Sequence, residues 1–306
     1  MYKRNVPPMV YYGFLAVLYL FLGALLPASK ATQQIYHLSG AEYHLLLFSV
    51  QLPLVLFWLP AFFGYIKLNE YASLIKKSPE GPPYQALARG LQWLAWGLAV
   101  PSIISLILNT IANSHPGFHA VSLIVGGYIS LLFPLIAFNI ISNGSHALAQ
   151  RTKAIVQVNG AKSLLFIFAI LGTIFCFATF RHIDLSHAGN SLNPYYLPTW
   201  LVVVSLVVPY LYAWFVGLLA AYQMLLLSRH TQGSLYRQAF QYMAAGLTLV
   251  IISLGVVECF RSVVPRSGHL SISAILIATY IFELISTGGF ILISYGVTRL
   301  KKLEEV

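Results

Sequence analysis

Eight long apolar runs dominate this sequence and limit what it can fold into. A helix needs about 20 apolar residues, with a range of about 17 to 25, to cross a hydrocarbon core about 30 Å thick, and all eight runs are long enough. They lie near residues 11–28, 43–66, 91–111, 119–142, 163–180, 197–227, 240–260 and 271–296. The runs lack the polar alternation of barrel strands, whereas helices satisfy their own backbone hydrogen bonds in lipid. We therefore expect an all-α polytopic membrane protein with eight transmembrane helices.

The few charged residues predict how the chain is oriented. They make up 8% of the 306 residues, against about 25% in soluble domains. Of the 18 Lys and Arg residues, 14 fall at the two ends and in the connections near 67–89, 151–162 and 229–237. The other side holds Lys30, Arg181, Arg261 and Arg266. The positive-inside rule then places both termini in the cytoplasm, and we expect a prokaryotic cytoplasmic membrane.

The net charge of +10 is accounted for by this topology and by anionic lipid, so the bilayer is the expected partner and nucleic acid is not. No GxxxxGK[ST] phosphate-binding loop occurs in the sequence. We expect no enzymatic activity.

The sequence also resembles itself when it is shifted by 152 residues. The shift aligns YISLLFPLIAFNIISNGSHAL with YIFELISTGGFILISYGVTRL, and it pairs Tyr128 with Tyr280 and Gly144 with Gly296. This similarity predicts a tandem duplication, with one four-helix repeat over residues 1–153 and a second over 154–306. Because four spans return the chain to its starting side, the two repeats are expected to be parallel.

One acidic residue, Glu283, lies in the middle of the last apolar run. A mid-membrane carboxylate costs about 2.5 to 3.5 kcal/mol on insertion scales, so it needs a partner, a water-filled cavity or a proton. Thr279, Ser286 and Thr287 lie one helical turn away and form a polar strip with it. Duplication does not account for this acid, because the equivalent residue in the first half is Leu131.

Three interpretations of Glu283 remain open, and they lead to different functions. The first is a transporter or channel for a small solute or ion, with Glu283, its polar strip and Asn139 on a path between the repeats. The second is a hydrogen-bonded Glu that locks helix packing, and the third is contact with a partner subunit. The last two fit a non-catalytic membrane subunit or scaffold of a homo-oligomer or a larger complex.

Four histidines suggest a further function class. His37 and His119 are 82 residues apart, as are His187 and His269, and all four map to the outer connections. Imidazole nitrogens bind Cu and Zn, so the chain could instead be an outer-face metal or redox protein. Solvated or interfacial histidines are the simpler interpretation, and otherwise no cofactor is expected.

Overall fold

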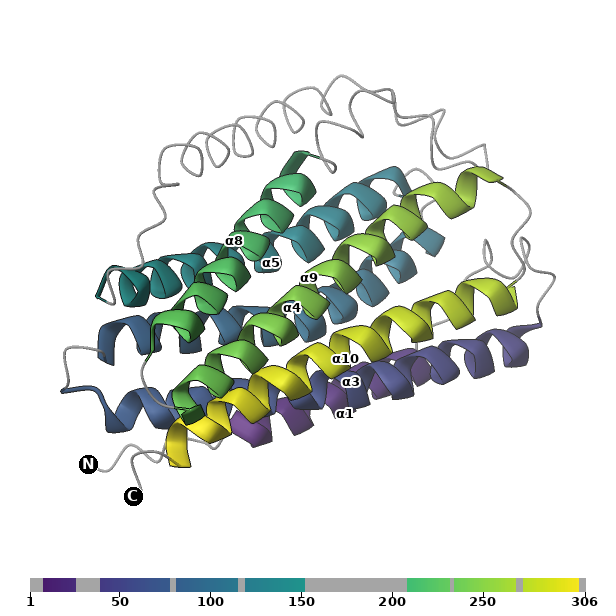
Figure 1. Ribbon diagram of the computed structural model, residues 1–306. Helices are drawn as coiled ribbons and strands as arrows, with labels where there is room; N and C mark the ends of the chain where they lie inside the picture. The colour runs from purple at the N-terminus through teal and green to yellow at the C-terminus, as the bar shows by residue number, and fades with distance from the viewer. Residues whose placement is uncertain are drawn as a thin grey trace. The chain divides into compact units, whose positions relative to one another are not determined.

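Every regular element in the described part of the chain is an α-helix. The computed structural model describes residues 8–25, 39–77, 81–114, 119–151, 208–231, 234–267 and 272–302, in which no strand occurs. The helices are α1 (Pro8–Leu25), α3 (Gly40–Leu74), α4 (Gly81–Ser114), α5 (His119–Arg151), α8 (Val208–His230), α9 (Ser234–Ser267) and α10 (Ile272–Lys302) (Figure 1). The prediction of an all-helical protein is confirmed for these residues.

The seven helices coincide with seven of the predicted spans, and the predicted span at 163–180 lies outside the described residues. Several helices are longer than the apolar runs that predicted them. α3 has 35 residues, which corresponds to about 52 Å at 1.5 Å per residue. Such a helix is longer than the hydrocarbon core is thick, so polar residues occupy its ends.

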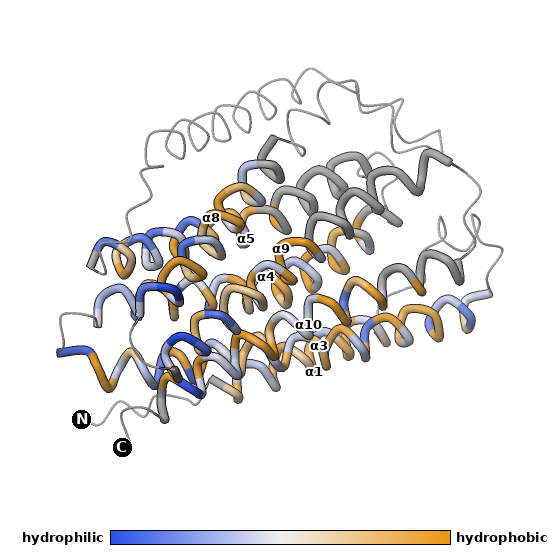
Figure 2. The backbone as a smooth tube through the Cα atoms, in the orientation of Figure 1, coloured by the Kyte–Doolittle hydropathy of each residue, from blue (hydrophilic) through white to orange (hydrophobic). Residues whose placement is uncertain are grey.

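Four helices in the described ranges are long and apolar enough to cross a membrane. They are Gly40–Leu74, Gly81–Leu108, Leu132–Gln150 and Tyr280–Leu300. Figure 2 shows hydrophobic residues along these helices and more hydrophilic residues where α3 ends and α4 begins. We call this the basic end, because it carries Lys67, Lys76, Lys77, Arg89, Arg229, Arg237 and Arg299. This distribution supports a membrane protein.

The helices form two compact units, and each unit draws on both halves of the sequence. In the described residues, the first unit contains α1, α3 up to Val55, α4 from Trp96, α5 up to Phe133 and the start of α8 up to Tyr212. The second unit contains α3 from Leu56, α4 up to Ala95, α5 from Pro134, α8 from Ala213, and all of α9 and α10.

In the first unit, polar bonds join α1 to α3. The Tyr12 hydroxyl donates to the Val55 carbonyl at 2.7 Å, and the Gln51 amide donates to the Tyr19 carbonyl at 3.1 Å. Gln51 is only 1% exposed, and it occupies the space beside Gly23, where a Cβ would lie 2.0 Å from its Oε1. A polar side chain inside an apolar bundle is thus satisfied by the backbone of its neighbour.

α3 begins with a capping box. The Ser39 amide donates to Glu42 Oε2 at 2.7 Å, and the Glu42 amide donates back to Ser39 Oγ at 3.3 Å. These two bonds satisfy backbone donors that the first turn of a helix leaves without partners. Glu42 therefore has a structural role, the capping of α3.

In the second unit, glycines allow α9 and α10 to pack closely as an antiparallel pair. A Cβ on Gly289 would lie 2.6 Å from the Gly246 carbonyl, and one on Gly296 would lie 2.7 Å from the Ala239 carbonyl. α4 and α5 pack in the same way, because a Cβ on Gly144 would lie 3.0 Å from the Pro83 carbonyl. Small residues bring helix backbones together where lipid provides no hydrophobic drive between helices.

Candidate functional site

Glu283 is partly buried and lies on a side of α10 that is turned away from its exposed apolar face. That face consists of Ile277, Ile281, Leu284, Ile291 and Tyr295, which are 43% to 59% exposed. At 100° per residue, Glu283 lies about 120° around the helix from the mean direction of this face. The carboxylate therefore does not point at the surface that lipid would cover.

Glu283, Thr287 and Ser294 follow one another along the same side of α10, and we call them the Glu283 stripe. Glu283 lies 11 residues before Ser294, which is about three helical turns. The Ser294 hydroxyl donates to the Pro60 carbonyl of α3 at 3.1 Å and also to Phe290 of its own helix at 2.8 Å. The stripe thus meets α3 at its Ser294 end.

Two predicted polar neighbours of Glu283 are shielded from solvent: Ser286 is buried and Thr287 is partly buried. Thr287 Oγ1 is buried and has no hydrogen-bond partner in the described part of the chain. Leaving a hydroxyl in this state costs about 1 to 3 kcal/mol, so such an atom indicates a position for water, an ion or a ligand. Ser286 is 6% exposed, and Glu283 itself has an interaction partner.

The other predicted site residues are less informative. Thr279 lies on α10 one turn before Glu283. Asn139 lies on α5, and its amide donates to the Leu135 carbonyl of the same helix at 2.8 Å. One N–H donor of the Asn139 side chain is therefore bonded within α5 itself.

The predicted metal site falls mostly outside the described residues. His37, His187 and His269 lie there, and His119 is the first residue of α5. Among the residues that the structure does describe, no group of three or more His, Cys, Asp or Glu could hold a metal ion. The histidine site stays a prediction.

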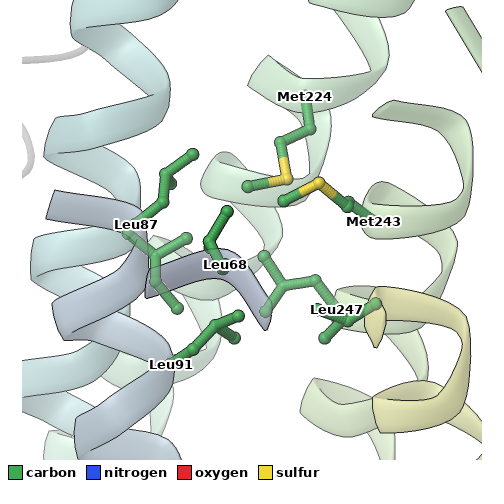
Figure 3. Close-up of a pocket in the computed structure, with 8 residues that line it drawn as sticks. Leu68, Leu87, Leu91, Met224, Met243 and Leu247 are labelled. Carbon is green, nitrogen blue, oxygen red and sulfur yellow. The ribbon is translucent and has the colours of Figure 1, made fainter. Parts of the chain in front are cut away.

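The centre of the second unit holds a small apolar cavity that the sequence did not reveal. It has a volume of about 10 Å³, and Figure 3 shows side chains from several helices directed towards it. Its lining residues are Leu68, Leu87, Leu91, Ile141, Met224, Met243, Leu247 and Ile293. A buried water needs two to four polar partners, and none of these side chains supplies one, so we expect the cavity to be dry.

One sequence signal does point to this cavity. The 152-residue shift pairs Leu91 with Met243 and Ile141 with Ile293, and all four residues line it. On α10, Ile293 lies 10 residues beyond Glu283 towards the basic end, a distance of about 15 Å along the helix axis. Glu283 and the dry core thus lie at different levels of α10, whereas Ser294, at the other end of the stripe, is next to Ile293.

The contact between α3 and α10 predicts that substitutions at Gly64 and Ser294 have coupled effects on stability. A Cβ on Gly64 would lie 2.7 Å from Ser294 Oγ and no closer than 3.8 Å to any other atom. Gly64→Ala should therefore turn the hydroxyl away from the Pro60 carbonyl. Ser294→Ala removes the same bond and should lower the free energy of unfolding by about 0.6 kcal/mol. In Gly64→Ala the same loss is offset by the better helix propensity of alanine, about 1 kcal/mol.

The double variant should be no less stable than either single variant in detergent melts, because the two changes remove one interaction. Ser102→Ala is the control, because within the described residues the Ser102 hydroxyl donates only to the Leu98 carbonyl of its own helix. Strictly additive losses in the double variant would show that Ser294 does not contact α3.

The arrangement on α10 combines a carboxylate, hydroxyls and one polar atom without a partner, which suits binding of a proton or a small cation. Comparisons with protein-family models, curated proteins and solved structures find no match for this chain. The functional assignment therefore depends on the chemistry of these residues.

Proposed function

We propose that this protein moves a small solute or ion across a membrane, and that the Glu283 stripe is the polar part of its path. The main observation behind this proposal is Thr287 Oγ1, which is buried one turn from Glu283 and has no hydrogen-bond partner among the described residues. An acid within an apolar helix is costly, and such acids usually face the bundle interior and mark ion or substrate pathways. The stripe has this placement, because it is turned away from the exposed apolar face.

The helix boundaries support two parallel four-helix repeats. α4 begins at Gly81 and α9 at Ser234, while α5 begins at His119 and α10 at Ile272. Both offsets are 153 residues (234 − 81 and 272 − 119), one more than the sequence shift. The close contact of Gly144 with Leu87 also has its counterpart in that of Gly296 with Ala239. Repeats of this kind commonly enclose transport sites between them.

The dry cavity suggests how such a path would be closed. Two repeat-related pairs, Leu91 with Met243 and Ile141 with Ile293, meet around it. Hydrophobic constrictions can block ions by excluding water. In this conformation the apolar core would seal the path between Glu283 and the basic end, which by the positive-inside rule faces the cytoplasm together with both termini.

A non-catalytic membrane subunit is the second candidate, and the same core favours it. The backbone contacts at Gly246 and Gly289 and the dry centre describe a rigid bundle. Such a protein would form a homo-oligomer or join a larger complex, and Glu283 would be a packing element. A metal or redox function at the outer histidines is the third proposal, and stoichiometric Cu or Zn in purified protein would support it.

The protonation behaviour of Glu283 separates transporter from scaffold. We would follow its carboxyl infrared band in purified protein during pH titration and exchange into heavy water, with Glu283→Gln to assign the band. On a transport path the band should titrate reversibly and exchange quickly. A carboxyl that stays protonated and exchanges slowly would overturn the transport proposal and favour the packing role.

A further inference from the structure

An arginine is held against two tyrosines where the exposed face of α10 approaches the basic end. The Arg299 guanidinium lies 5.0 Å from the centre of the Tyr295 ring and donates a hydrogen bond to the Tyr295 hydroxyl. Tyr295 in turn packs edge-on against Tyr242 of α9, with ring centres 4.9 Å apart and planes at 85°. Arg299 is thereby held against Tyr295, which itself packs on α9.

The position of this cluster along α10 matches the edge of a bilayer. Among the α10 residues whose exposure is described, the exposed apolar face runs from Ile277 to Tyr295, and Arg299 follows one turn later. Arg299 lies 22 residues after Ile277, a rise of about 33 Å along the helix, close to the thickness of the hydrocarbon core. Tyrosines gather at the membrane interface, so a membrane-spanning α10 would place the guanidinium near the level of lipid phosphates.

The charge of Arg299 is available to a ligand. Within the described ranges, no carboxylate forms an ion pair with it. A simple structural role exists, since a basic residue in the last turn of a helix complements the helix dipole. That role does not require the stacking on Tyr295, which fixes the direction of the guanidinium beside the exposed apolar face of α10.

We propose that Arg299, Tyr295 and Tyr242 form a binding site for the phosphate group of an anionic phospholipid. The acyl chains would lie along the exposed face of α10, against Ile291, Leu284 and Ile281. Guanidinium groups bind phosphate through paired hydrogen bonds, and anionic headgroups attract basic residues at the membrane surface. The proposal requires only that α10 lies in a membrane, so it does not depend on transport.

The test is a titration of the full-length protein in detergent with phosphatidylglycerol or phosphatidylcholine, followed by native mass spectrometry. The wild type should bind one phosphatidylglycerol with about fivefold higher affinity than phosphatidylcholine, the contribution typical of one basic residue at a membrane surface. Arg299→Gln should abolish this preference. Arg229→Gln, at an exposed arginine of the same end, should leave it unchanged.

Two additions keep the test decisive. Tyr295→Phe retains the ring but loses the hydroxyl that orients Arg299, so it should lose part of the preference even if Arg299→Gln does not fold. Millimolar inorganic phosphate should not displace the lipid. Equal affinity for the two lipids, an unchanged preference in Arg299→Gln or Tyr295→Phe, an equal loss in Arg229→Gln, or displacement by free phosphate would overturn the proposal.

Discussion

Gly289→Ala should separate the antiparallel pair of α9 and α10 and lower the melting temperature, whereas Gly288→Ala should not. A Cβ on Gly289 would lie 2.6 Å from the Gly246 carbonyl and 3.0 Å from the Val250 amide nitrogen. Both are backbone atoms, so the helices themselves must move apart. Overpacking of this kind costs about 1 to 3 kcal/mol.

The neighbouring glycine is a matched control. A Cβ on Gly288 would meet nothing within 4 Å, and this residue lies on the side of α10 that carries Leu284 and Ile291. Alanine is also the better helix former by about 1 kcal/mol, so Gly288→Ala should be neutral or slightly stabilising. Thermal unfolding of both variants in the same detergent makes the comparison. Equal melting temperatures would contradict the close packing at Gly289.

Glu283→Gln should abolish ion or solute movement while leaving the fold intact. Glutamine keeps the size and hydrogen-bonding capacity of the side chain but cannot carry a charge or exchange a proton. If the carboxylate stabilises a charged species on the path, its removal should reduce flux to the level of empty vesicles. If it only packs α10, flux is unaffected.

Proton flux is measured in proteoliposomes that contain a pH-sensitive dye and are energised by a potassium diffusion potential. Flux of a panel of other small ions and solutes is measured next. Glu70→Gln is the control, because Glu70 lies towards the basic end of α3 and its carboxylate pairs with Lys67 at 3.2 Å. It should keep wild-type flux. Transport that survives in Glu283→Gln would remove Glu283 from the path. A wild type without flux for any species would favour the scaffold.

The secondary structure could be predicted from the sequence because lipid leaves a chain few choices. A run such as 43–66 is too long and too apolar for anything but a helix, and α3 covers it. The helix bounds were harder to predict, because the polar ends of α3 and α9 lie outside the apolar runs. The mid-helix position of Glu283 and its separation from the lipid face also follow from spacing along a single helix.

The tertiary structure decided which neighbours each helix face meets. Gly288 and Gly289 are adjacent and identical in the sequence, yet one contacts the α9 backbone and the other faces open space. The missing partner of Thr287 and the dry cavity around Leu91 and Met243 depend equally on the packing of several helices. Periodicity along a helix sets the direction of each side chain, whereas the identity of the atoms it meets depends on residues far away in the chain.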